Sequence, residues 1–411
     1  MTPRRSARHA RRRTPSLLRG VYLPRTADGI AFAVTTYGIP LLVLATTGSA
    51  GLTGLAFALE WVPRIGAFTV AGTLVDRYGT ARIFRAACLA RAVLVLAAAA
   101  VLTSLDNHTL AATATVMCLA ALTGVLTEFS YIAVETEGGE ASRGAGERAH
   151  RVQSVLLGID QSAMLAGPAV SGLLVEYGGP ALMLGCLAAF SLLAALLGLP
   201  RSAAPATEVQ KKGLRTGWST LRSLPALSWL IGGLLVSNGA VALLQAAMPV
   251  IVVSELGHSS ADAGLIWSAA AVASLLAVTA SRMAIDRWGL WPVGAVAAAV
   301  AAGATLAVSQ AETYRTYLVL IAVLMAGEGG LTVVLRTLRS HLIPSAVFGS
   351  TLAVSVLVLL LPFPAAGLLV AAVPPAQLGH IIAGAAVLQA VGLAAAFARL
   401  RTLPALSAAR A

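Results

Sequence analysis

The sequence predicts an all-α polytopic membrane protein with twelve transmembrane helices arranged as two six-helix bundles. Composition is the first reason, because 58% of the 411 residues are hydrophobic and only 11% are charged, which is typical of proteins that cross a membrane several times. Length is the second, because a helix needs about 20 apolar residues to span the hydrocarbon core. The segments that reach or approach this length are 29–47, 52–73, 83–104, 109–131, 152–175, 181–199, 227–252, 262–284, 292–309, 316–337, 347–372 and 378–398.

A polar motif that occurs twice is the third reason. The first copy lies between the second and third apolar segments and contains Gly72, Asp76, Arg77, Gly79 and Arg82. The second copy lies between the eighth and ninth segments and contains Asp286, Arg287 and Gly289, without the trailing arginine. A repeat with a period of half the chain predicts two equivalent halves. The simpler alternative is a tight turn that uses an aspartate cap and a glycine.

Lysine and arginine are distributed unevenly along the chain, whose net charge is +12. If the N-terminus is inside, nearly all of the 29 basic residues lie on the inner side, whereas Arg315 lies outside and Arg64 and Arg91 lie within segments. The positive-inside rule then places both termini in the cytoplasm. We interpret the basic N-terminal arm as a tail that contacts anionic lipid, with no nucleic-acid partner. A twin-arginine signal is the alternative, and the many later segments argue against a cleaved leader.

The predicted domain organisation follows these segments. It consists of a basic cytoplasmic arm over 1–27, a helix bundle over 28–199, a cytoplasmic linker over 200–225, a second bundle over 226–398 and a cytoplasmic tail over 399–411. We expect a monomeric multi-pass protein of the bacterial cell (inner) membrane.

Ionisable and polar residues inside the predicted helices are candidates for substrate or proton sites, because such groups are costly in a membrane. Glu60 and Arg64 share one helix face near the midplane, so either they line a cavity or they only neutralise each other. Glu328, also near the midplane, is our first choice for proton coupling, and a permanent ion pair with Arg64 is its alternative. The further candidates are Asp28, which opens the first segment, Asp160, Gln161, Asn238 and Gln245.

Three more expectations concern charged and helix-breaking residues. We expect Arg91 to extend toward the cytoplasmic surface. We expect the acidic residues Glu135, Glu137 and Glu140 to lie in a solvated cytoplasmic loop. Two prolines in the eleventh segment, at 362 and 364, predict a break that would suit a gating helix.

The repeated motif resembles the signature loop between helices 2 and 3 of the major facilitator superfamily. Gly167, Pro168 and Gly172 resemble the helix 5 element of facilitator antiporters, with Ala163 and Ser171 in place of two glycines. Close helix packing is the simpler role for these small residues. Asp28, a proline at 63, the aspartate-arginine loop and the surroundings of Arg91 resemble the branch of siderophore and macrolide exporters, similar to the enterobactin exporter.

The resemblance implies two bundles around a central cavity at the midplane and alternating access. The activity it implies is proton-driven efflux of a small organic molecule by an antiporter. The fourth segment lacks the central arginine of many proton antiporters. An importer or symporter would share the fold, and a non-transporting scaffold is the more distant alternative.

Several chemistries have no matching motif in the sequence. It contains no phosphate-binding G-x-x-x-x-G-K-[ST] loop, no histidine pair at metal-ligand spacing and no G-x-S-x-G nucleophile turn. We therefore expect no enzymatic activity, no cofactor and no metal. The expected partners are a small-molecule substrate, protons and membrane lipid.

Overall fold

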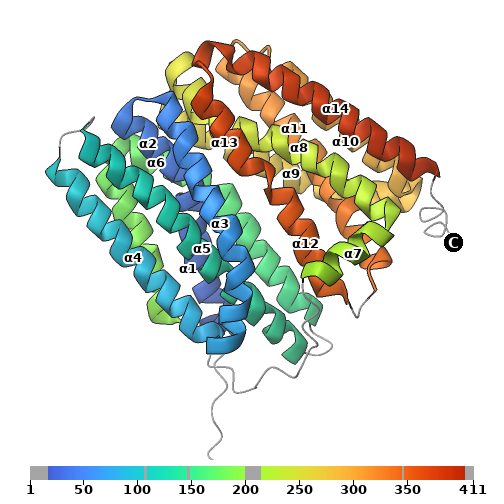
Figure 1. Ribbon diagram of the computed structural model, residues 1–411, viewed down its shortest axis with the longest axis horizontal. Coiled ribbons are helices and arrows are strands. Elements are labelled where there is room, and N and C mark those ends of the chain that lie inside the picture. Colours follow the sequence, from blue (N-terminus) through green and yellow to red (C-terminus); the bar gives the residue numbers. More distant parts are fainter. Residues whose placement is uncertain (1–16, 106–108, 146–148, 200–213, 345–346, 403–411) are drawn as a thin grey trace, which may run out of the picture.

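The structure is a computed structural model that describes residues 17–105, 109–145, 149–199, 214–344 and 347–402. Within these ranges the chain forms helices joined by short turns (Figure 1). Ten of the described helices are long and apolar enough to cross a membrane. The lysines of the linker, Lys211 and Lys212, and the arginines among residues 1–16 lie outside the described residues.

The first group of helices occupies one side of Figure 1. Its members are α1 (Leu23–Ala33), α2 (Ile39–Thr47), α3 (Ala50–Tyr78), α4 (Thr80–Ser104), α5 (Leu110–Gly144) and α6 (Ala149–Leu197). Wider π-helical turns, Leu18–Tyr22 and Val34–Gly38, precede α1 and join it to α2. Helical structure therefore begins at Leu18, and our expectation that Asp28 opens the first helix is wrong.

Helix α6 is a hairpin of two helical limbs and not one straight helix. Its apolar part, Val155–Leu197, has 43 residues, which would extend about 65 Å if straight, twice the thickness of a hydrocarbon core. Gly179 interrupts the helical dihedrals with φ 64° and ψ −173°. Ser171 and Met183, one on each limb, both lie within 3.5 Å of a Cβ built on Gly38. In a continuous helix they would be about 18 Å apart along the axis, so the chain reverses direction at Gly179.

The second group of helices lies on the other side of Figure 1. Its members are α7 (Leu214–Ser223), α8 (Pro225–Pro249), α9 (Ser260–Trp288), α10 (Leu290–Val308), α11 (Tyr314–Leu342), α12 (Phe348–Leu360), α13 (Pro362–Ala372) and α14 (Leu378–Thr402). A π-helical turn, Val250–Glu255, extends α8, and a short 3₁₀ turn, Pro375–Gln377, precedes α14. The break predicted from the prolines is present, because α12 and α13 meet at Leu361. Part of the predicted linker is helical, since α7 lies within it.

The two copies of the polar motif form nearly identical turns. Gly79 alone separates α3 from α4, with φ 85° and ψ 148°, and Gly289 alone separates α9 from α10, with φ 86° and ψ 168°. Glycine adopts such positive φ values without the steric cost that a Cβ would add. Arg77 lies over the ring of Tyr78 at 5.2 Å, and Arg287 lies over the ring of Trp288 at 6.0 Å. The internal repeat is therefore present in the backbone as well as in the sequence.

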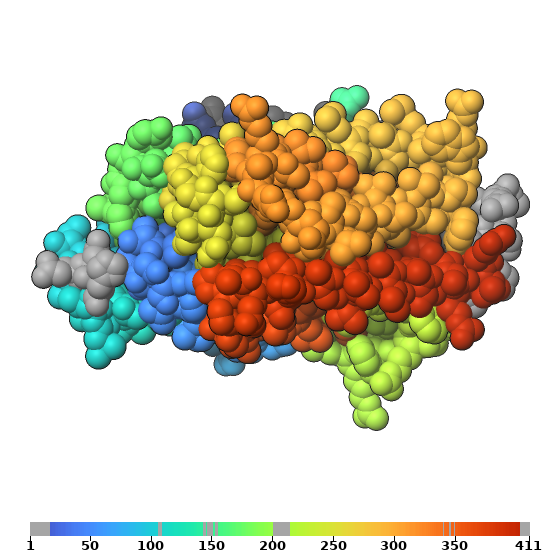
Figure 2. All heavy atoms as spheres, turned by 90° about the horizontal axis from the view of Figure 1, so that it is seen from above, coloured from blue at the N-terminus to red at the C-terminus, as the bar shows by residue number. Residues whose placement is uncertain are grey.

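The two groups touch through glycines at one end of the molecule. A Cβ on Gly54 of α3 would lie 2.6 Å from the backbone of Ala371 in α13, and one on Gly264 of α9 would lie 2.1 Å from the carbonyl oxygen of Pro168 in α6. Real Cβ atoms essentially never approach other atoms within 3.0 Å, so only glycine permits these approaches. Figure 2, seen from above, shows the blue α2–α3 segment against the orange-red α13–α14 segment.

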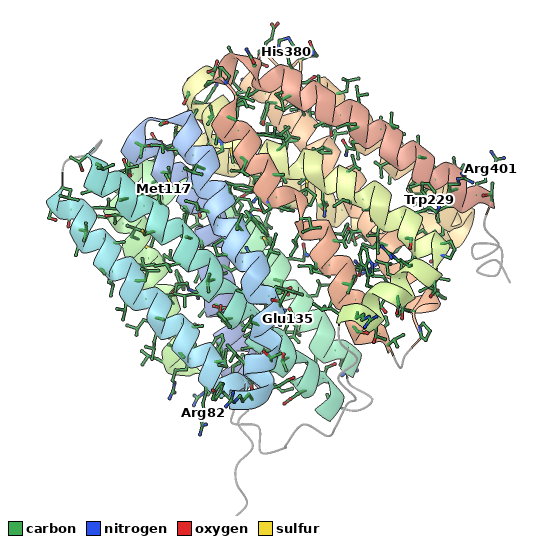
Figure 3. All side chains as sticks on the ribbon, viewed as in Figure 1. Arg82, Met117, Glu135, Trp229, His380 and Arg401 are labelled. Atoms are coloured by element: carbon green, nitrogen blue, oxygen red, sulfur yellow. The ribbon has the colours of Figure 1, made fainter. Side chains whose placement is uncertain are left out.

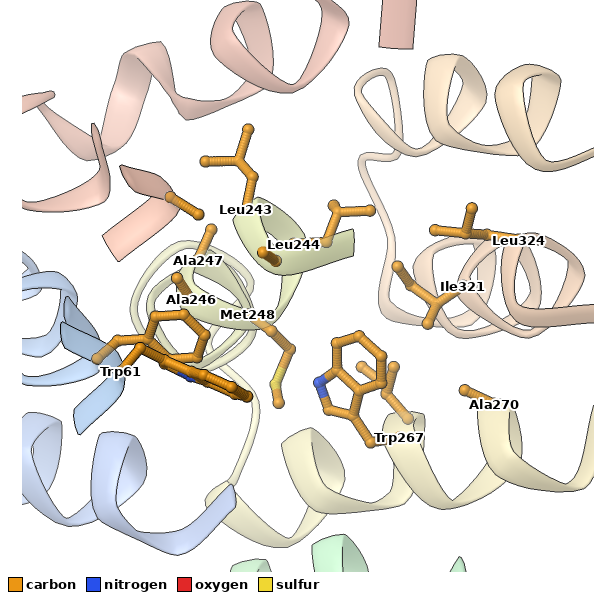
Figure 4. Packing of buried hydrophobic residues seen from close by; sticks show 14 of the residues in the cluster. Trp61, Leu243, Leu244, Ala246, Ala247, Met248, Trp267, Ala270, Ile321 and Leu324 are labelled. Carbon is orange, nitrogen blue, oxygen red and sulfur yellow. The ribbon is translucent and has the colours of Figure 1, made fainter. Parts of the chain in front are cut away.

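Aromatic side chains continue this contact below the glycines. The rings of Trp61 in α3 and Phe363 in α13 are tilted against each other with their centroids 4.2 Å apart, and the ring of Tyr37 lies 6.0 Å from that of Trp267 in α9. Figure 4 shows Trp61 beside Ala246 and Ala247 of α8, all of them buried. Toward the opposite end, where α3 is followed by α4, the two groups diverge, since α3 packs against α13 and then separates from α12 (Figure 1).

Candidate functional site

A cavity of about 360 Å³ lies between the two groups, below the aromatic contact. This volume is near the lower end of the range of small-molecule sites. Helices α1, α3, α5 and α6 supply most of its wall, and α11 and α12 supply the rest. The lining residues are Arg25, Asp28, Gly29, Phe32, Trp61, Arg64, Phe68, Glu128, Tyr131, Val134, Leu157, Asp160, Gln161, Ala163, Met164, Arg336, Val356 and Leu360.

Arg25 holds two carboxylates at one end of the wall. Its Nε and Nη2 atoms donate to the two oxygens of Asp160 at 2.8 and 2.5 Å, and Nη2 also donates to Glu135. The guanidinium is 4% exposed. Such paired, bidentate geometry is the strongest form of the arginine–carboxylate contact. Arg25, which we had assigned to the N-terminal arm, therefore belongs to the cavity.

The acidic stretch after the fourth segment is helical, and our expectation of a solvated loop is wrong. Helix α5 continues to Gly144. Within it, Glu135 contacts Arg25, and Glu137 is buried and accepts a hydrogen bond from the Thr80 hydroxyl at 2.7 Å. In Figure 3 Glu135 lies in the lower part of the first helix group, as does Arg82. The hydrophobic pattern predicted the end of the apolar segment at residue 131. The helix itself continues beyond the apolar residues to Gly144.

Arg64 makes its close ion pair with Glu128 and not with Glu60. Its Nε donates to Glu128 at 2.8 Å, whereas its Nη1 lies 3.9 Å from Glu60. The longer separation exceeds that of a hydrogen bond. Glu60 is fully buried and does not line the cavity. The ion pair with Glu60 is therefore present but is not self-contained, because Arg64 has a closer partner, missed from the sequence, on another helix 64 residues away.

Aromatic rings hold the Arg64 guanidinium in place. Its Cζ atom lies 4.4 Å from the centre of the Trp61 ring and 4.7 Å from that of Phe32. A guanidinium over an aromatic face gains energy from the ring quadrupole, and more so when both are desolvated. Trp61 and Phe32 therefore set the orientation of Arg64 where it meets the cavity.

Asp28 reaches behind the wall to Arg91. Arg91 is fully buried, and its Nη2 donates to Asp28 at 2.5 Å. Its remaining nitrogens donate to Ser191 at 2.9 Å and to Thr127 and Ser130 at 3.3 and 3.2 Å. A buried charge is tolerated when it is paired and hydrogen-bonded in this way. The expectation that Arg91 extends to the surface is wrong.

Arg336 is the charged residue that the second group adds to the wall. It lies on α11 and is exposed. Within the part of the chain that the structure describes, no carboxylate lies within ion-pair distance of it. We had counted it among the inner-side basic residues, although it stands at the end of the apolar segment 316–337, and the helix continues to Leu342.

Glu328 lies in a second polar cluster, away from the cavity wall. It is buried, accepts a hydrogen bond from the hydroxyl of Ser237, and accepts another from Nε2 of Gln389 at 3.2 Å. Gln389 also donates to the Ser237 oxygen at 2.8 Å. These contacts join α11, α8 and α14. The ion pair with Arg64 that we considered does not form, and no cation lies within ion-pair distance of Glu328 among the described residues.

Of the remaining polar candidates, one lines the cavity and the others lie elsewhere in the helices. Gln161 lines the cavity, whereas Asn238 donates to the carbonyl oxygen of Leu359 at 2.9 Å and Gln245 is half-buried, and neither of these two lines it. Asp76 and Asp286 are exposed at the ends of α3 and α9.

The element Gly167, Pro168 and Gly172, which resembles helix 5 of facilitator antiporters and lies on α6 here, packs helices together. A Cβ on Gly167 would lie 2.2 Å from that of Ala33, and one on Gly172 would lie 2.2 Å from the carbonyl oxygen of Ser260. The amide of Ala169, next to Pro168, donates to the Ser268 hydroxyl at 3.1 Å. The element therefore joins α6 to α1 and, across the two groups, to α9.

A second hollow of about 470 Å³ lies between α10 and α14. Only alanine, glycine, leucine, valine and phenylalanine line it, so it offers no polar group to orient a ligand. Among the described residues, no group of three histidine, cysteine or acidic side chains could hold a metal ion. The charged cavity is therefore the candidate site.

Comparison with known proteins agrees with this architecture. The chain resembles a bacterial homologue of the iron transporter ferroportin in an inward-facing state (15% identity, 93% of this chain and 98% of that chain, TM-score 0.68). It also resembles a D-xylose–proton symporter (17% identity, 90% of this chain and 96% of that chain, TM-score 0.71). A third similar structure is the nucleoside transporter NupG (12% identity, 91% of this chain and 100% of that chain, TM-score 0.68). At these identities the likeness concerns the fold. A search of curated proteins found no match. Residues 26–363 match the family model of the Major Facilitator Superfamily, and the chain belongs to that family of transporters.

Proposed function

We propose that this chain is a secondary active transporter that exports a small organic molecule from the cytoplasm by alternating access, driven by protons. We further propose twelve membrane crossings in two bundles of six. The ten apolar helices, the second limb of α6 and α3 make up that number. Helix α3 is less apolar because it carries Glu60 and Arg64 in its middle.

The cavity is the observation that carries this proposal. It lies between the two groups, it is closed at one end by the glycine and aromatic contacts, and both groups contribute charged residues to its wall. In alternating access, a central site opens to one side at a time as the groups rock about it. The positive-inside distribution assigns the diverging end to the cytoplasm of a bacterial cell, with both termini on that side.

Proton coupling has two candidate locations in this arrangement. In the wall, Arg64 lies between Glu128 and, farther away, Glu60, so protonation of Glu128 would release the guanidinium toward the other carboxylate. In the second group, Glu328 accepts hydrogen bonds from two neutral side chains. We propose that Glu328 carries the proton and that the Arg64 cluster responds to substrate.

Inside-out membrane vesicles test the proposal. A proton gradient is established by respiration and followed with a pH-sensitive dye, and compounds from a growth-inhibition panel are then added. An exporter that exchanges protons for substrate predicts proton release from the vesicle when its substrate is added, and no release in vesicles without the protein. Substrate-dependent proton uptake into respiring right-side-out vesicles, without proton release from inside-out vesicles, would indicate import by a symporter. The absence of any compound-dependent flux would favour the non-transporting alternative.

A further inference from the structure

We infer that the cavity binds an organic anion with an apolar or aromatic body, held by Arg336 of the second group and by donors of the first group. This inference rests on the proposed function, because it names the substrate class of the same site. It starts from the balance of charge and of hydrogen bonding in the wall.

The carboxylates of the wall are already paired. Asp28 faces Arg91 at 2.5 Å and Glu128 faces Arg64 at 2.8 Å. Asp160 faces Arg25 at 2.5 Å, and Glu135 contacts the same guanidinium. A carboxylate that already accepts a charge-assisted hydrogen bond has less to offer a cationic ligand.

The wall atoms without partners are donors. Among the described residues that line the cavity, the buried side-chain atoms that lack a hydrogen bond are Nη1 of Arg25, Nη1 of Arg64 and Nε1 of Trp61. Each of these side chains is more than nine-tenths buried. A buried donor without a partner costs free energy, and a ligand that brings acceptor oxygens would satisfy it. Glu60 also accepts no hydrogen bond, but it lies 3.9 Å from Nη1 of Arg64 and does not line the cavity.

Arg336 supplies a cation that no carboxylate of the described residues faces. It is exposed in the cavity and has no ion pair among the described residues, and Arg339, one turn along the same helix, is buried with Nε and Nη2 unpaired. A carboxylate or comparable anion can take two parallel hydrogen bonds from a guanidinium. The rings of Phe32, Trp61 and Tyr131 on the facing wall would cover the apolar body of such a ligand.

The location of these groups links binding to transport. The donors belong to the first group and Arg336 to the second, and all of them line one cavity of about 360 Å³, so we infer that one anion contacts both groups. A ligand that binds both groups favours the state in which they are closer, and this is the differential affinity that shifts a conformational equilibrium. The anion would thus promote closure of the cytoplasmic side.

Three probes with one ring system and different charges test the inference. Naphthoate, naphthylmethylamine and naphthylmethanol are titrated into the purified full-length protein in detergent micelles, and binding is measured by calorimetry. Naphthoate is expected to bind most tightly. If naphthylmethylamine binds as tightly as naphthoate or more so, or if no probe binds, the inference is overturned without need of any variant.

Arg336→Gln then tests the assigned residue. Loss of one charge-assisted contact is expected to weaken naphthoate binding by about 10- to 100-fold, to leave naphthylmethanol binding within about twofold, and to be partly rescued in Arg336→Lys. Arg315→Gln is the matched control, because this exposed arginine lies on the same helix far from the cavity. An unchanged naphthoate affinity in Arg336→Gln would contradict the assignment.

Flux measurements separate this inference from the proposed function. In proteoliposomes, anion-selective binding without any movement of the probes would contradict transport and leave the binding class intact. Movement of all three probes without preference for charge would support transport and overturn the anion site.

Discussion

Replacing Gly264 by alanine should shift the protein away from the state described above. The added Cβ would lie 2.1 Å from the Pro168 carbonyl oxygen and 3.1 Å from the Cα of Ala169, both in the backbone of α6. Since real contacts are essentially never shorter than 3.0 Å, α9 and α6 must separate by about 1 Å. Overpacking of this kind costs about 1–3 kcal/mol, equivalent to about a 5- to 150-fold change in a conformational equilibrium.

The cost falls on one conformation if the proposed alternating access is correct. The contact of Gly264 joins the two groups at the closed end of the molecule, opposite the diverging end. This contact would be broken in the outward-open state, in which the closed end opens. Gly264→Ala should therefore lower the ratio of inward-open to outward-open molecules by this factor. Gly185→Ala in α6 is the matched control, because a Cβ there meets nothing within 4 Å while the helix propensity changes by the same amount.

Cysteine accessibility measures the shift. Leu157 lines the cavity, so Leu157→Cys in a background without the three native cysteines reports its exposure to a membrane-impermeant maleimide. In inside-out vesicles the labelling rate of the cysteine should fall in Gly264→Ala and not in Gly185→Ala. As a control for folding, both purified variants should elute as monomers from gel filtration in detergent. Equal labelling of the two folded variants would refute the argument that the glycine contact stabilises this state.

Three further predictions concern charged groups. Asp28→Asn or Arg91→Gln alone should lower the free energy of unfolding by about 3–5 kcal/mol, because each leaves a lone buried charge. The double variant should lose less, and thermal unfolding in detergent compares the three variants. Losses in the double variant equal to the sum of the single losses would contradict the pairing. Glu328→Gln should abolish gradient-driven flux in proteoliposomes while downhill exchange persists, and surviving gradient-driven export would exclude Glu328 as the proton carrier. Asp76→Asn should reduce transport with normal insertion, and full transport at normal expression would argue against a gating role for this turn.

Much of the fold could be predicted because it depends on local chemistry. Apolar segments of membrane length indicate spanning helices, since the backbone must satisfy its hydrogen bonds internally in lipid. Gly79 and Gly289 predicted equivalent turns, because both positions use the same left-handed backbone region. Gly167 and Gly172 predicted close packing, because only the absence of a side chain permits it.

The helix ends were harder to predict. The charged residues at 135, 137 and 140 interrupt the hydrophobic pattern, yet α5 continues to Gly144. Two of them, Glu135 and Glu137, have partners on other helices. Arg25, which we assigned to the N-terminal arm, and Arg336, which stands at the end of an apolar segment, likewise both belong to the cavity wall.

The sequence by itself determined the class of protein, the repeated turns and which residues would be costly to bury. Only the tertiary structure decided which of those residues meet. Periodicity identifies neighbours on one helix, such as Glu60 and Arg64, but it contains no information on how separate helices are rotated and shifted against each other. Arg64 therefore lies closer to Glu128 than to its neighbour four residues away, and Arg91 pairs with Asp28, because helix packing brings those groups within hydrogen-bond distance.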